Sequence, residues 1–437
     1  HTCHKMRSTH FFFIVLTGIF MACYGSQVST LSANPPLEYS IKTRTDQAMK
    51  SPMELLQQSA CGDLIRSVTN DSRDHLEKVL PNERFWTFIR MNSAPADDIM
   101  LIDTEIHSWK MMLNQAVALK MAGSKLKLLA VAHDSETCSH TIAKGIPCYY
   151  DHQWYNELAH VYGGWADTKG PYPGYKLHLV MLVRMMTTTV ASCDGRNVFL
   201  SDSDVLFYRD PMDYVFEDVN IMITAAPIGD QQWSGYFFSD QPGRTHSLNN
   251  GVVHYKSNNV TNAFLLTLAA HCISSLIAKH GDPDFGFLQT QFNFDFKSIQ
   301  LKVHPSRDVS NKTTHRLTAA AGYSNTAGEC YDCYHGTVPW RSDIVPTSKT
   351  SELRVGIFPT SRCISSNSVP QRTLEIIVAS TEALKKQDRT NWGWGELGGE
   401  SRMLCVHANG HARSTGNDTT KMSAKEEWFH KINSWFL

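Results

Sequence analysis

The segment at residues 198–210, VFLSDSDVLFYRD, constrains the fold most, because two aspartates one residue apart, Asp202 and Asp204, interrupt an apolar run. A charged side chain in such a setting costs free energy unless it is paired or bound to a metal. Alternation along an extended chain would send both carboxylates to one face, where they could bind one hard divalent cation. The simpler alternative is a turn in which Asp202 acts as a cap. The pattern predicts a strand that ends at a metal site.

Strand and helix patterns alternate upstream of this segment. We expect strands at residues 85–91, 127–132 and 146–150, and helices at residues 105–121, closed by Gly123, at residues 135–144 and from Lys176 to the strand before Asp202. This order predicts an α/β fold with a doubly wound, mostly parallel sheet flanked by helices. Ligands of such sheets bind at the carboxyl ends of the strands, which is where Asp134, Asp202 and Asp204 fall.

The second half of the chain is less regular and would bind the acceptor. Strands are expected from Ile221 and from Gly251, and the loop between them contains Asp230 and Trp233. Aromatic and hydrogen-bonding side chains together suit a sugar, although an ordinary surface loop has a similar composition. Residues 305–350 are rich in Ser, Thr, Gly and Cys and are expected to form an irregular insertion.

Near the C-terminus, the motif LCVHANG places an apolar strand at residues 403–406 directly before His407. Such a strand would deliver the imidazole to the same sheet edge as the two aspartates. Carboxylate and imidazole ligands together suit Mn²⁺, whereas Mg²⁺ prefers oxygen. The alternative is a structural histidine, since the chain has 20 of them.

These blocks together resemble the nucleotide-diphospho-sugar transferase family, glycosyltransferase family 77, which has the GT-A fold. The resemblance spans about residues 85–437 and is strongest in four places: SD-x-DVLF with Arg209-Asp210-Pro211, the helical run that Lys176 opens, NNGVVHY at residues 249–255, and VHANG at residues 406–410. The GT-A domain is accordingly expected over residues 81–437.

The resemblance implies a metal-dependent glycosyltransferase that uses a UDP-sugar and a glycan or glycoprotein acceptor. It also implies retention of configuration, an α-linked product and a pentose or galactose donor. With the strand-end argument, it gives Asp202, Asp204 and Gln289 as catalytic residues; Asp202, Asp204 and His407 as metal ligands; Asp134, Lys176, Ser203, Gly410 and Lys421 as donor-binding residues; and Asp230, Trp233, Asn249, Asn250 and Gly251 as substrate-binding residues.

One departure concerns Gln289. Members of the family carry an Asp-Gln pair before a Phe-Asn dipeptide, whereas this chain has Leu288 before Gln289, and the nearest upstream acid is Asp284. The role of Gln289 therefore stays open. A catalytically decayed, lumenal glycan-binding protein of the same fold is the main alternative. A metal-dependent hydrolase would need a base that activates water, for which the sequence offers no clear candidate.

The N-terminal region predicts entry into the secretory pathway. Lys5 and Arg7 precede an apolar run at residues 11–24, an order typical of a targeting segment. The run is shorter than the ~20 residues of a full membrane span, so residues 1–27 are expected to form a cleaved signal peptide or, in a thin membrane, a short signal anchor that would attach the chain to the bilayer. Residues 28–80 suit a stem or linker with a possible helix.

Composition agrees with a globular protein in the lumen of the Golgi or a related compartment. N-x-S/T sequons occur at Asn70, Asn259, Asn311 and Asn417. Eleven cysteines, of which Cys3 and Cys23 precede residue 27, suit disulfides in an oxidising compartment, with Cys330 and Cys333 in one C-x-x-C motif. The 41 basic and 42 acidic residues leave a net charge of −1, which argues against a nucleic-acid partner.

Overall fold

In a computed structural model of the chain, the described residues are 49–68, 70–161, 174–226, 247–278, 302–303, 334–340, 351–358, 363–365, 371–386, 404–408 and 418–437. All of them belong to one compact unit, Asp46–Leu437. The expected leader and residues 28–48 of the expected stem lie outside the described residues.

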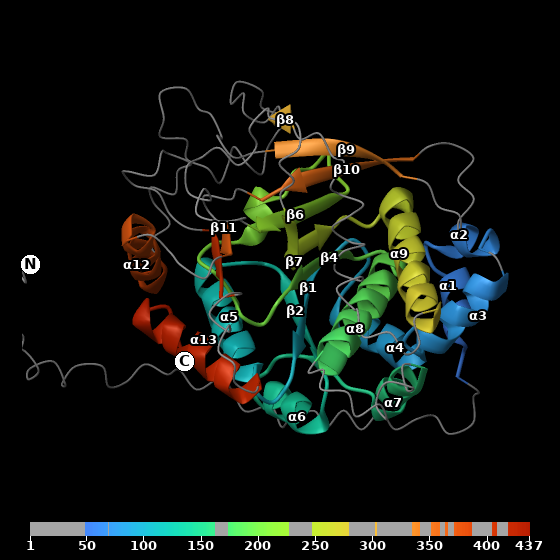
Figure 1. The fold of residues 1–437 in the computed structure, drawn as a ribbon, viewed down its shortest axis with the longest axis horizontal. Coiled ribbons are helices and arrows are strands. Elements are labelled where there is room, and N and C mark those ends of the chain that lie inside the picture. Colours follow the sequence, from blue (N-terminus) through green and yellow to red (C-terminus); the bar gives the residue numbers. More distant parts are fainter. Residues whose placement is uncertain are drawn as a thin grey trace, which may run out of the picture. The chain divides into compact units, whose positions relative to one another are not determined.

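A nine-stranded sheet runs through the described residues in the order β3-β2-β1-β4-β7-β6-β10-β9-β8 (Figure 1). Its strands are β1 (Asp98–Thr104), β2 (Lys127–Ala132), β3 (Cys148–Tyr149), β4 (Asn197–Ser201), β6 (Ile221–Ala226), β7 (Ser247–Tyr255), β8 (Lys302–Val303), β9 (Tyr334–Trp340) and β10 (Ser351–Ile357). The pairings make β7 and β9 run against the other strands. Most strands therefore share one direction, as predicted.

Helices cover both faces of this sheet (Figure 1). One face packs against α1 (Pro52–Gln57), α2 (Gly62–Arg66), α3 (Asn70–Val79), α4 (Glu83–Asn92), α7 (His152–Val161), α8 (Gly174–Cys193) and α9 (Asn259–Ala278). On the other side lie α5 (Trp109–Ala122), α6 (Ser135–Ala143), α12 (Gln371–Lys385) and α13 (Asp418–Lys431). The predicted layered α/β architecture is confirmed.

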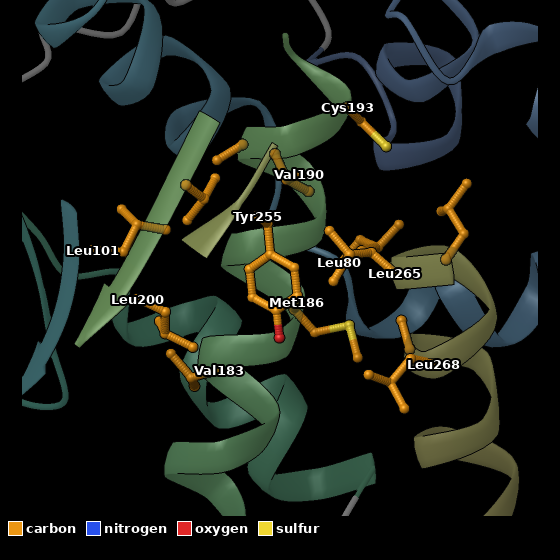
Figure 2. Packing of buried hydrophobic residues seen from close by; sticks show 14 of the residues in the cluster. Leu80, Leu101, Val183, Met186, Val190, Cys193, Leu200, Tyr255, Leu265 and Leu268 are labelled. Atoms are coloured by element: carbon orange, nitrogen blue, oxygen red, sulfur yellow. The ribbon is translucent and has the colours of Figure 1, made fainter. Parts of the chain in front are cut away.

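The period-2 alternation of strand β1 accounts for the two cores. Ile99 and Leu101 belong to the cluster beneath α8 and α9, whereas Met100 and Ile102 belong to the cluster beneath α5. Figure 2 shows the first cluster, in which Leu101 and Leu200 of the sheet lie near α8 side chains such as Val183 and Met186, with Leu265 and Leu268 of α9 beyond them. Both faces of the central strands are buried, which is why these strands are apolar throughout.

A smaller three-stranded sheet has the order β11-β12-β5. It joins β11 (Cys363–Ser365), β12 (Cys405–His407) and β5 (Val205–Phe207), with β12 parallel to β11 and antiparallel to β5. Strand β5 comes directly after the aspartate pair, so this sheet connects the late histidine motif to the turn that follows β4.

The prediction of a strand at residues 85–91 is wrong, because this segment lies in helix α4. The Asn82 side chain caps the helix by accepting a hydrogen bond from the Arg84 backbone N–H at 2.9 Å. Phe85, Trp86, Phe88 and Ile89 recur at helical spacing and are buried together. The sequence interpretation missed the first strand, β1, which follows this helix.

Other expected elements are present. Helix α5 and strand β2 lie where they were predicted, and Gly123 ends α5 in the left-handed conformation with a φ of 72°. The possible helix before residue 81 corresponds to α1–α3. Strand β9 lies within residues 305–350, which were expected to be irregular, and pairs along its whole length with β10. In the described part of the chain, no helix is both long and apolar enough to cross a membrane.

Candidate functional site

Asp202 and Asp204 flank a tight turn between β4 and β5 rather than lying in one strand. The Val205 backbone N–H donates to the Asp202 carbonyl at 3.2 Å, and the Asp202 N–H donates to the Gly251 carbonyl of β7 at 2.8 Å. The expectation that strand alternation aligns the two carboxylates is therefore wrong. The turn, with Ser203 at its centre, brings them together instead.

His407 reaches these carboxylates through the smaller sheet. Strand β12 pairs with β5 so that His407 stands opposite Val205, and the Ala408 N–H donates to the Asp204 carbonyl at 3.1 Å. The imidazole Nε2 atom lies 3.2 Å from a carboxylate oxygen of Asp202 and 3.2 Å from one of Asp204. One ligand atom from each of the three residues lies within 4.8 Å of the others. The expected convergence is present, although His407 arrives by the small sheet and not by the main one.

Gly251 lies against the same three residues. A Cβ atom at this position would stand 2.3 Å from His407 Cε1 and 2.7 Å from Asp202 Oδ2, well inside van der Waals contact. The pairing of β6 with β7 shifts register between Ile223 and Thr224, opposite this part of β7, and such irregularities bend a strand locally. Glycine is required here because only a residue without a side chain leaves room for the imidazole and the carboxylate.

Each aspartate also contacts a buried cation. The guanidinium of Arg184, from α8, pairs with Asp202 and, through Nε, with Asp103 of β1 at 2.7 Å. The ammonium of Lys425, from α13, lies 2.5 Å from the second carboxylate oxygen of Asp204. Four distant parts of the chain thus contribute charge to one site.

The pKa values follow from these contacts. Burial by itself would raise the pKa of Asp202, but Arg184 and His407 outweigh it and lower that pKa to about 2. The pKa of Asp204 is lowered, against burial, by His407 and Lys425. Burial would lower the pKa of His407, yet Asp204 and Asp202 raise it to about 9. For Asp103, burial dominates over Arg184 and raises the pKa to about 7. Both members of the aspartate pair are therefore ionised at neutral pH.

The three residues fit a divalent cation chemically. His407 Nε2 is buried and faces one carboxylate oxygen of Asp202 and one of Asp204, each at 3.2 Å. With its pKa raised to about 9, the imidazole is protonated at neutral pH, and binding a cation there would release that proton. Two carboxylate oxygens and one imidazole nitrogen form a donor set that suits Mn²⁺. Asp202, Asp204 and His407 would hold such a cation; that they do so stays a prediction.

The remaining predicted donor- and substrate-binding residues are spread over several elements of the chain. Asp134 follows β2, as expected, but its carboxylate caps α6 by accepting from the backbone N–H and the hydroxyl of Thr137 at 2.6 and 2.7 Å. The chain positions of the remaining residues are as follows: Lys176 in α8, Asn249 and Asn250 in β7, and Lys421 in α13. Gln289, Asp230, Trp233 and Gly410 lie outside the described residues. Their predicted roles stay predictions.

Sequence reasoning missed Asp103, Arg184 and Lys425. Asp103 ends the apolar strand that was not recognised, so its position at the ligand edge went unseen. Arg184 is a charge inside the apolar helical run LHLVMLVRMM, and such a charge signals a buried partner. Lys425 lies among ordinary polar residues of α13, and nothing local distinguishes it.

A family comparison decides what kind of protein contains this site. The model of the nucleotide-diphospho-sugar transferase family matches residues 126–422, more than half of the chain. The chain belongs to this family. It is thus a nucleotide-sugar-dependent glycosyltransferase, and the predicted GT-A type α/β architecture agrees with that assignment. Asp202, Asp204 and His407 all lie within the matched region.

Solved structures add distant likenesses. Mouse xyloside xylosyltransferase 1 has 13% identity and a TM-score of 0.30, covering 45% of this chain and 81% of its own. The galactosyltransferase LgtC has 11% identity and a TM-score of 0.34, with 78% and 96% covered. The glycosyltransferase GlyE of Streptococcus pneumoniae has 11% identity and a TM-score of 0.30, with 77% and 64% covered. These values carry no argument about substrate. No curated protein matches the sequence.

Proposed function

We propose that this glycosyltransferase is metal-dependent and moves a sugar from a UDP-sugar to a glycan or glycoprotein acceptor. The observation that supports this most is the convergence of Asp202, Asp204 and His407, which each place one possible ligand atom within 4.8 Å of the others. The family resemblance further favours retention of configuration, an α-linkage and a pentose or galactose donor.

The chain's own residues have separable tasks in this proposal. A divalent cation, when bound, stabilises the negative charge that develops on the diphosphate leaving group. Asp202, Asp204 and His407 would hold that cation. Arg184 fixes the orientation of the Asp202 carboxylate by joining it to Asp103. Gly251 leaves the space in which the imidazole and the carboxylate meet.

The test is release of free UDP from a panel of UDP-sugars, with and without candidate acceptors, at controlled Mn²⁺. One donor should give UDP release that rises with acceptor, requires Mn²⁺ and disappears after exhaustive EDTA treatment. Full activity after EDTA treatment would refute metal dependence. Nucleotide-sugar binding with no turnover on any acceptor would favour the alternative, a decayed glycan-binding protein of the same fold.

We also propose that the protein works in the secretory pathway, in the Golgi lumen, and reaches the membrane through its N-terminal segment if that segment is not cleaved. Three disulfides between cysteines that the structure describes support an oxidising compartment: Cys61–Cys193, Cys138–Cys148 and Cys363–Cys405. Of the sequon asparagines, Asn70 and Asn259 are exposed at the starts of α3 and α9, where an oligosaccharide could be attached.

A further inference from the structure

We propose that the Cys363–Cys405 disulfide positions His407 for metal binding, because it fixes the strand that carries the imidazole to the strand beside it. This inference rests on the proposed function, since it concerns the same metal site. The bond would then set the affinity of the site for a cation, and not only the stability of the fold.

Cys405 lies close to His407 and on the same face of the small sheet. The two residues are two positions apart on β12, and alternation along a strand directs such residues to one face. Across the ladder they stand opposite Phe207 and Val205 of β5, which share a buried cluster with Cys405 and Cys363. The disulfide is therefore packed in the core, next in line to the imidazole on that face.

Few hydrogen bonds hold the strand that carries His407. Strands β11 and β12 have three residues each, so the ladder between them is short. On the other side of β12, the Ala408 N–H donates to the Asp204 carbonyl at 3.1 Å. On the β11 side, Cys363 stands opposite Cys405. A covalent bond at this pair restrains β12 on the side away from β5, where backbone pairing alone would hold it weakly.

The carboxylates and the imidazole come from different sheets, so their relative position depends on how the sheets are joined. Asp202 is fixed to the main sheet, where its N–H donates to the Gly251 carbonyl at 2.8 Å. The Phe358 N–H, directly after β10, donates to a carbonyl of β6 in the same sheet at 3.0 Å. Cys363 comes five residues after Phe358. The disulfide thus ties the strand of His407 to chain that has just left the main sheet.

The site tolerates little displacement of the imidazole. A bound cation needs each ligand within about 0.2 Å of its ordinary distance. The ring also has little free room, because a Cβ atom at Gly251 would stand 2.3 Å from His407 Cε1. A small shift of β12 would therefore weaken cation binding while both carboxylates stay in place. Loss of the disulfide should reduce metal affinity through His407.

The test compares two disulfides in the full-length chain. Cys363→Ala/Cys405→Ala removes the bond beside His407, and Cys138→Ala/Cys148→Ala removes a bond between α6 and the edge strand β3. Both variants are titrated with Mn²⁺ by calorimetry under conditions in which circular dichroism shows the native fold. The Kd for Mn²⁺ should rise roughly tenfold in the first variant and stay within about twofold of the native value in the second.

A second comparison tests whether the effect acts through His407. His407→Ala is titrated with Mn²⁺ in chains with and without the Cys363–Cys405 bond. If the bond acts by positioning the imidazole, its removal should change the Kd of His407→Ala by less than about twofold. A general loosening of the site would instead weaken Mn²⁺ binding equally in both backgrounds, and that outcome would overturn the inference.

The remaining outcomes separate this inference from the proposed function. Cys363→Ala/Cys405→Val fills more of the core and replaces the double alanine variant if that variant does not fold. Native Mn²⁺ affinity in a folded variant without the bond overturns the inference alone. Failure of the native chain to bind Mn²⁺ in a way that Asp204→Asn abolishes overturns the metal site, and this inference with it.

Discussion

Asp202 and Asp204 contact different basic side chains, although only Ser203 separates them in the sequence. Arg184 reaches Asp202 from α8 and Lys425 reaches Asp204 from α13, while His407 lies 3.2 Å from both. Each carboxylate is thus kept ionised by a partner of its own, against the cost of burial. This explains how two acidic groups can stand side by side in an apolar setting without one of them being protonated.

Replacing either carboxylate by its neutral isostere should stop transfer. Asp202→Asn or Asp204→Asn keeps the shape of the turn but removes a charged ligand. We expect UDP release to fall by roughly a thousandfold, about 4 kcal/mol of transition-state stabilisation. Asp63→Asn, at an exposed pair with Arg66 on α2, is the matched control and should keep native activity. A folded Asp204→Asn enzyme with native turnover would remove the aspartate pair from the mechanism.

Gly251→Ala should disrupt the site without removing any ligand. The new methyl group would meet His407 and Asp202 at 2.3 and 2.7 Å, so one of them must move. We expect Mn²⁺ affinity and UDP release both to fall at least tenfold, with a stability loss of about 1–3 kcal/mol.

Gly145→Ala provides the comparison for that variant. It lies in the left-handed region with a φ of 78°, and a Cβ there meets nothing within 4 Å. It should cost about 1 kcal/mol of stability but leave Mn²⁺ binding unchanged. Calorimetric titration and chemical denaturation measure the two effects separately. Equal Mn²⁺ affinity in Gly251→Ala and the native chain would show that the close approach at Gly251 is unimportant.

At the scale of elements, the site depends on strands and helices that lie far apart in the sequence and contact one another in the fold. The three-stranded sheet places β12, late in the chain, beside the turn after β4. Disulfides tie further pairs: Cys61–Cys193 joins the start of α2 to the end of α8, and Cys363–Cys405 joins neighbouring strands β11 and β12. Helix α8, which positions Arg184, is therefore fixed at its C-terminal end.

Removing the long-range disulfide should cost more than removing the short-range one. The sequence separation is 132 residues for Cys61–Cys193 and 10 residues for Cys138–Cys148. Chain-entropy arguments give about 5 kcal/mol for the first and about 3 kcal/mol for the second. Denaturant unfolding of Cys61→Ala/Cys193→Ala and of Cys138→Ala/Cys148→Ala checks this. A larger loss of stability in the second double variant would contradict the entropic account.

At the scale of the whole molecule, the compartment decides whether these disulfides can form. Expressed in eukaryotic cells from its full-length sequence, the chain should enter the secretory pathway and carry N-linked oligosaccharide at the exposed residues Asn70 and Asn259. Glycosidase treatment should increase its electrophoretic mobility, and Asn70→Gln/Asn259→Gln should reduce that shift. An unglycosylated full-length protein in the cytosolic fraction would contradict the proposed location.

The sequence by itself determined the α/β class and the aspartate pair. Apolar strands and period-3.6 helices alternate strongly enough to be recognised locally, as β2, α5 and α6 show. The local pattern failed at residues 85–91, whose apolar side chains fit both the period of a strand and that of a helix. These residues lie in helix α4, because Asn82 caps the helix and its aromatic side chains are buried together. Short apolar runs do not distinguish helix from strand.

Only the tertiary structure decided how the site is assembled. Strand β12 brings His407 within 3.2 Å of both carboxylates. The apolar surroundings of Arg184 in the sequence signal a buried partner but do not say which one, and nothing near Lys425 in the sequence points to Asp204. The turn at Ser203, not strand alternation, aligns Asp202 with Asp204. Charge pairing in a buried site depends on distances across the fold, and no local pattern in a sequence encodes those distances.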